Sequence, residues 1–213
     1  GKDSVRIGDP TATDYSNLKV TVNTNNGTSG GDGIKSTNDT DENSGYVTIN
    51  GGTVSIQSYS DGIQAEQAFT MNGGDVTVET YSGHTFTGSA SGGNSGNPWG
   101  GGMGGGGMDG NANKTDISAK GIKAVGLYSD EAKTTYVSGG DITINGGTLN
   151  IDSSDDSLHC AGTMQILGGD LKLASADDGI HSDTDVIIGS ESDATNYTSP
   201  SVDISYSYEG VEG

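Results

Sequence analysis

Six aspartates occupy the same turn of a sequence that repeats along the chain, and four of them form adjacent pairs: Asp32, Asp61, Asp155, Asp156, Asp177 and Asp178. The two pairs lie one repeat apart. If the repeats stack as neighbouring strands, about 4.8 Å apart, four carboxylates repel one another unless they share a cation. Ca²⁺ suits such a site because it is hard and takes 6–8 oxygen ligands. The pairs therefore predict bound calcium.

The isolated aspartates leave two interpretations open. Asp32 and Asp61 each precede a glycine, and an aspartate in that place also builds a tight turn without any metal. If they bind a cation as well, the protein holds more than one calcium ion. Turn formation alone does not explain the adjacent pairs, which repeat in register.

A polar stripe follows the acidic turns, at a position expected to face outward in every repeat: Lys35, Gln64, Lys123, His159, His181 and Glu212. Such a stripe is either a solvated face or a strip that binds a ligand, and all of its residues except Glu212 are candidate carbohydrate contacts. No third histidine is near His159 and His181 in the pattern, which favours surface residues over metal ligands.

Three aromatic residues are further candidates for carbohydrate binding. Tyr59 and Tyr81 are separated by the same interval as the aspartate pairs, which suits either cross-strand packing or a platform for sugar rings. Trp99 is the only tryptophan and stands in a glycine-rich segment. It is either a lid that stacks on sugar or a loop residue without a role.

The elements that position these residues come from a repeat. The Gly-Gly pairs at 51–52 and 73–74 are separated by the same interval as those at 146–147 and 168–169. Each unit has three short runs of alternating apolar and polar residues, which indicates strands with one buried face. One unit cannot bury that face alone, but stacked units can. The sequence therefore predicts an all-β, right-handed parallel β-helix of about 22 residues per coil.

Aligning the units places the apolar residues on ladders. The four aliphatic ladders are Ile49, Met71, Ile144, Ile166 and Ile188; Val54, Val76, Leu149, Leu171 and Val202; Ile56, Val78, Ile151, Leu173 and Ile204; and Ile34, Ile63, Ile122, Leu158, Ile180 and Val211. A ladder of small residues, which includes Cys160, lies beside the fourth. In the same alignment Lys120 takes the place of the acidic turn residue in its repeat. Gly83 or the following loop is expected to take that place in the repeat before it.

The chain is expected to form a single domain over residues 1–213. A glycine-rich insertion at about 83–114 should be a mobile loop, since so much glycine does not fix a backbone cheaply. Residues 190–200 interrupt the last coil. The repeat sequence at 209–213 stops at a ladder position, so the native chain is expected to continue beyond it.

Charge and composition limit the kinds of partner that we expect for this protein. There are 29 Asp and Glu against 9 Lys and Arg, a net charge of −20, which argues against nucleic acid and anionic membranes as partners. No apolar run approaches the roughly 20 residues that span a bilayer. One cysteine excludes an intramolecular disulfide. The composition fits a monomeric protein that is secreted or held on a bacterial surface.

Five related motifs carry a family resemblance: GDGIKST (31–37), SDGIQAE (60–66), AKGIKAV (119–125), DDSLHCA (155–161) and DDGIHSD (177–183). With the glycine-rich insertion they resemble the bacterial calcium-binding, pectate-lyase-like β-helix domains of cellulose- and pectin-binding surface proteins. The resemblance implies a right-handed β-helix, several calcium ions at the matching aspartate turns, and affinity for cellulose and polygalacturonate. It favours a non-catalytic carbohydrate-binding protein.

The likeness to polysaccharide lyases keeps a catalytic alternative open. A calcium-dependent pectate lyase needs a base, and the only arginine, Arg6, lies outside the repeat. Lys120, on a rung between aspartates, is then the candidate base. A lysine among carboxylates keeps a high pKa, however, and is a poor base at neutral pH. The favoured interpretation is that Lys120 supplies positive charge where no calcium binds.

Overall fold

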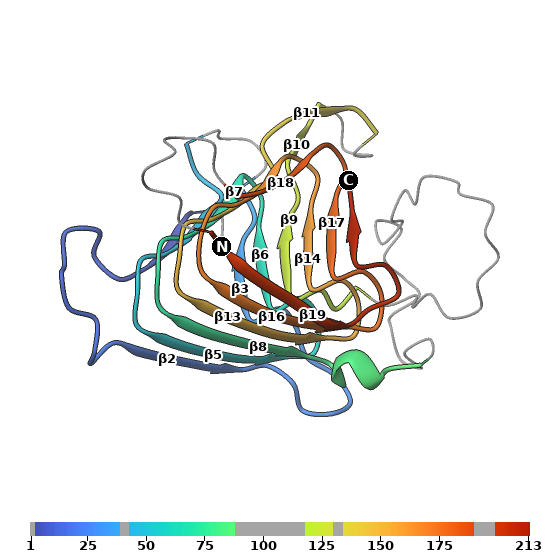
Figure 1. The fold of residues 1–213 in the computed structure, drawn as a ribbon, viewed down its shortest axis with the longest axis horizontal. Helices are drawn as coiled ribbons and strands as arrows, with labels where there is room; N and C mark the ends of the chain where they lie inside the picture. Colours follow the sequence, from blue (N-terminus) through green and yellow to red (C-terminus); the bar gives the residue numbers. More distant parts are fainter. Residues whose placement is uncertain (1–2, 39–42, 88–117, 130–133, 190–198) are drawn as a thin grey trace.

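The computed structural model describes residues 3–38, 43–87, 118–129, 134–189 and 199–213. Within them, short strands form three parallel sheets of six strands each (Figure 1). The chain visits the three sheets in turn and then repeats the circuit, so that each coil lies against the next. The prediction of an all-β architecture built from stacked parallel coils is confirmed.

The strands are short in all three sheets. The first sheet contains β1 (Val5–Ile7), β4 (Tyr46–Ile49), β7 (Ala68–Met71), β12 (Asp141–Ile144), β15 (Met164–Ile166) and β18 (Val186–Ile188). The second contains β2 (Lys19–Asn23), β5 (Thr53–Ser58), β8 (Asp75–Thr80), β13 (Thr148–Ser153), β16 (Asp170–Ser175) and β19 (Ser201–Tyr206). The third contains β3 (Ile34–Ser36), β6 (Ile63–Ala65), β9 (Ile122–Ala124), β14 (Leu158–Cys160), β17 (Ile180–Ser182) and β20 (Val211–Glu212).

The core is a narrow column of inward-facing aliphatic side chains. The strand register confirms the predicted ladders; in the third sheet, for example, Ile122 pairs with Ile63 on one side and with Leu158 on the other. These three side chains are fully buried, and Cys160 lies in the core beside them. Burying an aliphatic side chain of this size contributes about 1.5–3 kcal/mol. A single column of this kind explains how a chain with only 30% hydrophobic residues folds.

The corner between the first and second sheets is held by an asparagine ladder. Asn72 donates a side-chain hydrogen bond to Asn50, and Asn145 donates one to Asn72, each at 2.8 Å. The second glycine of each following Gly-Gly pair has a positive φ, +103° at Gly74, which a residue with a Cβ rarely adopts. The repeated Asn-Gly-Gly text thus sets a turn that recurs from coil to coil.

The large insertion leaves the solenoid after β8 without adding a rung. A short 3₁₀ turn, η1 (Gly83–Thr85), follows β8, and β9 then pairs directly with β6. The expectation that Gly83 or the loop occupies a rung is therefore wrong, because Gly83 lies against Asp152 instead. Residues 88–117, which include Trp99, lie outside the described part of the chain.

A small hairpin also departs from the coil pattern. Strands β10 (Leu127–Tyr128) and β11 (Tyr136–Ser138) pair antiparallel and project beyond the first and third sheets (Figure 1). Alternation over two or three residues is too short to predict such a pair. Among the described residues, no helix is long and apolar enough to cross a membrane.

Candidate functional site

Backbone hydrogen bonds stack the turns that lead into the third sheet. The residue after each rung donates to the carbonyl of the next rung: Gly33 to Asp61, Gly62 to Lys120, Gly121 to Asp156, Ser157 to Asp178 and Gly179 to Glu209, at 2.8–3.0 Å. We call this the acidic turn ladder, with rungs Asp32, Asp61, Lys120, Asp156, Asp178 and Glu209. The predicted register of the acidic residues is correct.

Glycine follows most rungs because the coils approach closely there. A Cβ at Gly62 would lie 2.5 Å from the carbonyl oxygen of Gly121 and 2.2 Å from Val78. A Cβ at Gly121 would lie 2.4 Å from Ile151. The Asp-Gly-Ile text therefore reflects tight packing between turn and core as well as turn chemistry.

A buried hydroxyl at the end of each of four second-sheet strands fixes the turn that carries the acids, and on β5 Ser58 donates to the carbonyl of Ser60 at 2.8 Å. Ser153 donates to the carbonyl of Asp155 at 2.9 Å, and Ser175 donates to the carbonyl of Asp177 at 3.1 Å. Thr80 contacts the carbonyl of Ala119 in the same way. Sequence reasoning missed this anchor, although a serine or threonine at the same place in each copy signals it. This hydrogen bond ties the turn that carries each rung to the end of a second-sheet strand.

Lys120 lies between carboxylates of the next coil. Its Nζ is 3.0 Å from Asp155 Oδ2 and 2.5 Å from Asp156 Oδ2, and only 13% of the side chain is exposed. Burial acts to lower the pKa of Lys120, but the charges of Asp156 and Asp155 outweigh it and raise the pKa above the ordinary value. The ammonium is therefore a stable cation of the ladder.

The pKa values of the two neighbouring carboxyl groups shift differently in this environment. Burial raises the pKa of Asp155 to about 6, although the charge of Lys120 opposes the rise. Burial acts on Asp156 in the same direction, but Lys120 and the hydrogen bond with His159 overcome it and lower the pKa. One ammonium thus faces two carboxyl groups whose pKa values are shifted in opposite directions.

The next coil brings further carboxylate oxygens to the same corner. Oxygens of Asp155, Asp156 and Asp177 lie within 4.8 Å of one another, close enough to share a metal ion. Asp178 is fully buried, and its Oδ1 has no hydrogen-bond partner among the described residues. A buried carboxylate oxygen without a partner is costly unless a cation or water satisfies it. The predicted Asp-Asp site is thus a group of buried oxygens able to hold a cation.

Asp32 and Asp61 lie on the same ladder with different partners. Asp32 Oδ2 pairs with Lys35 at 2.5 Å, within one coil. Asp61 accepts a hydrogen bond from the backbone of Lys120 at 3.0 Å, and Lys123 Nζ lies 3.8 Å from it. Neither aspartate belongs to a potential three-residue metal group within the described ranges. These contacts satisfy the two aspartates with protein groups, while the proposal of a second calcium ion there stays a prediction.

The polar stripe runs beside the ladder as the sequence predicts. Its six members pair in register from strand to strand: Lys35, Gln64, Lys123, His159, His181 and Glu212. On the central strands they face outward between two buried positions. The carbohydrate contacts assigned to the stripe remain predictions, and the geometry gives them one continuous face.

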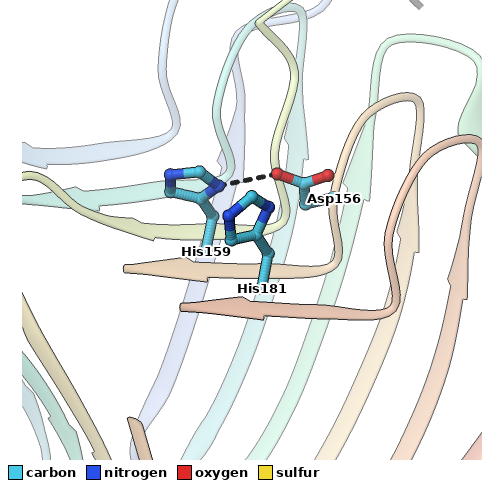
Figure 2. Close-up of side chains that lie close together, drawn as sticks. All are labelled: Asp156, His159 and His181. Atoms are coloured by element: carbon cyan, nitrogen blue, oxygen red, sulfur yellow. Dashed lines mark hydrogen bonds and ion pairs between the residues drawn. The ribbon is translucent and has the colours of Figure 1, made fainter. Parts of the chain in front are cut away.

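The two histidines of the stripe lie side by side. Figure 2 shows the imidazoles of His159 and His181 on neighbouring strands, with the Asp156 carboxylate next to His159. The ring centroids are 4.6 Å apart, and His159 Nδ1 is 2.8 Å from Asp156 Oδ2. Hydrogen bonds with Asp178 and Asp183 raise the pKa of His181 to about 10, whereas burial lowers the pKa of His159. The pKa values of the two adjacent imidazoles are thus shifted in opposite directions.

The aromatic candidates lie at the same corner as the acidic turns: Tyr59 directly follows β5, two residues before the rung Asp61, and Tyr81 directly follows β8. Tyr59 and Tyr81 meet edge to face at 5.0 Å, and Phe86 packs on Tyr81 in the same manner at 5.1 Å. This is cross-strand aromatic packing, and both tyrosines remain partly exposed. Their role as a sugar platform stays a prediction, as does the role of Trp99.

Two residues near that corner were not predicted as site residues. His84, in η1, contacts Asp152 Oδ1 through Nδ1 at 2.8 Å, and its ring lies 5.1 Å from the exposed ring of Tyr206. The segment around η1 does not follow the spacing of the repeat, so periodicity carries no signal for this contact. Only the three-dimensional path of the insertion brings His84 over β13 and β16.

The fold and the site together define a class of protein. It is a solenoid of parallel coils that carries carboxylates, a lysine and imidazoles along one corner. The chain belongs to a family described as carbohydrate-binding domain-containing protein, whose model matches residues 1–179. The matched range contains all the rungs from Asp32 to Asp178. No curated protein and no solved structure matches the chain.

Proposed function

We propose that this protein is a non-catalytic, calcium-dependent carbohydrate-binding protein for plant cell-wall polysaccharide, with cellulose and polygalacturonate as its ligands. The family supports the carbohydrate. The group of Asp155, Asp156 and Asp177 oxygens, beside the unpartnered Oδ1 of Asp178, supports the cation and is the observation that carries the proposal.

Calcium fits this group by charge and by ligand type. Four carboxylates share the corner with one ammonium, that of Lys120, so a divalent cation reduces the excess negative charge. All the ligand atoms are oxygens, which Ca²⁺ takes in irregular arrangements. A calcium ion held there, beside the polar stripe, gives uronate carboxylates of pectin a bridge to a protein whose net charge of −20 otherwise repels them.

The same proposal includes the handedness of the solenoid and the location of the protein. We expect a right-handed solenoid, as for parallel crossovers in general. We also expect a monomer that is secreted or held on a bacterial surface, where plant polysaccharide is met. Neither nucleic acid nor membrane insertion is part of the proposed function.

The alternative of a pectate lyase with Lys120 as base has less support. A general base needs a pKa near the working pH, and carboxylate neighbours hold Lys120 in its protonated form. Its side chain is also largely buried. Charge balance within the ladder is the simpler role for this residue.

Polysaccharide pull-down with and without chelator, beside an assay for unsaturated uronide, tests the proposal. We expect retention on cellulose and polygalacturonate, a larger loss on polygalacturonate when calcium is removed, and no unsaturated product. Retention unaffected by chelator would refute the calcium dependence. Unsaturated product that disappears in Lys120→Ala, while binding survives, would establish the lyase instead.

A further inference from the structure

The two histidines of the polar stripe form a second group of potential ligands, different in chemistry from the all-oxygen group. One ligand atom each from Asp156, His159 and His181 lies within 4.8 Å of the other two. A second set, Asp178, His181 and Glu212, meets the same criterion and shares His181. The imidazoles therefore stand in a cluster of carboxylates that spans three consecutive coils.

We infer that Asp156, His159 and His181 form a binding site for Zn²⁺ or a neighbouring late first-row divalent ion, which shares Asp156 with the proposed calcium site and adds two nitrogen ligands. Imidazole nitrogen is a ligand that zinc, copper and nickel prefer, whereas calcium and magnesium take oxygen. Two nitrogens and one carboxylate oxygen supply three ligands, and zinc commonly leaves its fourth position to water.

The geometry requires only a small contraction. Tetrahedral zinc with bonds of about 2.0–2.1 Å places ligand atoms about 3.3 Å apart, so atoms within 4.8 Å must close by about 1.5 Å at most. His159 Nδ1 and Asp156 Oδ2 are already 2.8 Å apart. The histidine side chains are about one-fifth exposed, so their rings have room to rotate and solvent can reach them.

The carboxylates around the rings favour a cation there, and Lys120, whose Nζ lies 2.5 Å from Asp156 Oδ2, must move from that oxygen when the oxygen binds the metal. Asp178 Oδ2 lies 3.3 Å from His181 Nδ1, while Oδ1 of the same buried carboxylate has no hydrogen-bond partner among the described residues. Asp183 and Glu212 face the same ring at 3.3 and 3.5 Å. These carboxylate oxygens give a negative potential around the His181 ring, which favours a bound cation.

The neighbouring strands show why the site lies at this point of the stripe. The preceding members of the stripe are Gln64 and Lys123, and an amide and an ammonium are poor partners for a transition metal. On β14 and β17 the stripe presents imidazoles directly beside acidic rungs. The inference does not rest on calcium binding, because the ligand types differ.

Co²⁺, added to chelator-treated protein in excess calcium, is the probe that tests the inference. We expect visible d–d absorption that saturates near one ion per chain and disappears when Zn²⁺ is added. Loss of a ligand should weaken Co²⁺ binding about 100-fold or more, beyond the range for outer-shell partners, in His159→Asn and in His181→Asn. His84→Asn is the matched control, because His84 is the remaining histidine and contacts Asp152 of β13, outside the proposed group.

A second measurement needs no variant. In the unmodified protein, Zn²⁺ should shift the imidazole NMR signals of two of the three histidines and leave the third unchanged. Absence of d–d absorption, absorption that survives both substitutions, or equal shifts of all three imidazoles would overturn the inference. Failure of the calcium proposal would leave these spectra unchanged and would show instead as a melting curve insensitive to calcium.

Discussion

Two halves of the acidic turn ladder neutralise their carboxylates in different ways. In the first coil, Asp32 pairs with Lys35 three residues later, at 2.5 Å. In the later coils the same spacing joins Asp156 to His159 at 2.8 Å and Asp178 to His181 at 3.3 Å. The backbone geometry is the same, but a permanent charge has been replaced by an imidazole, which exchanges protons and binds metals.

This comparison indicates the end of the ladder at which we propose exchangeable cations. Among the described residues, lysines partner the acids of the coils from Asp32 to Lys120, and Lys120 itself reaches into the coil of Asp155 and Asp156. Beyond that point the carboxylates outnumber the lysines. Calcium and a transition metal are therefore both proposed at the same end of the ladder, where lysines no longer balance the carboxylates.

The largest expected effect comes from removing the buried lysine. Lys120→Met should lower the free energy of unfolding by about 3–5 kcal/mol in calcium-free buffer, because Asp155 and Asp156 lose their buried partner. Lys35→Met is the control, and its exposed pair should matter by about 1 kcal/mol at most. Urea unfolding at neutral pH measures both. Equal effects would show that the two halves do not differ.

A second effect concerns the calcium that the later coils are proposed to hold. Calcium at about 100 times its Kd should stabilise the protein by about 2.7 kcal/mol, because the ion binds only the folded state. Asp156→Asn with Asp178→Asn should remove most of that gain, and magnesium should not replace calcium. The control is Asp75→Asn with Asp170→Asn, which makes the same charge change on exposed positions. A melting curve of the unmodified protein that ignores chelator would contradict the prediction.

A third effect, measured as a slope and not as a total, is a pH dependence at His181. Hydrogen bonds with Asp178 and Asp183 raise its folded pKa from 6.5 to about 10, so between these values the folded chain holds a proton that the unfolded chain has lost. Its contribution to stability is complete below pH 6.5 and falls as pH rises, by at most about 1.4 kcal/mol per pH unit. His181→Gln should flatten this slope in metal-free buffer, and His84→Gln should not. A slope that is the same in both variants would assign it to other groups.

The sequence predicted the repeat well and the local chemistry less well. Periodicity placed Ile122 between Ile63 and Leu158, and the acidic rungs one above another, because each coil repeats the spacing of the last. It placed Lys120 among carboxylates as a balancing charge, but it did not predict the contacts of His84 with Asp152 and Tyr206. Those depend on side-chain directions and on the path of an insertion, which the period of the repeat does not encode.

The histidines show the same limit in one pair of residues. Sequence spacing correctly put His159 and His181 on adjacent strands. It gave no reason to treat them as ligands, because no third histidine is near them in the pattern and the third member of the proposed group is a carboxylate of the neighbouring rung. Asp156 is three residues from His159, but only the folded turn brings its oxygen to the ring.

Retention on polygalacturonate as a function of free calcium tests the central claim most directly. It should be measured for the unmodified chain, the Asp156→Asn, Asp178→Asn variant and its Asp75→Asn, Asp170→Asn control. We predict that retention by the unmodified chain and the control rises with calcium and saturates, and that the ladder variant needs much more calcium for the same retention. Identical curves for all three proteins, or retention that does not depend on calcium, would contradict the account.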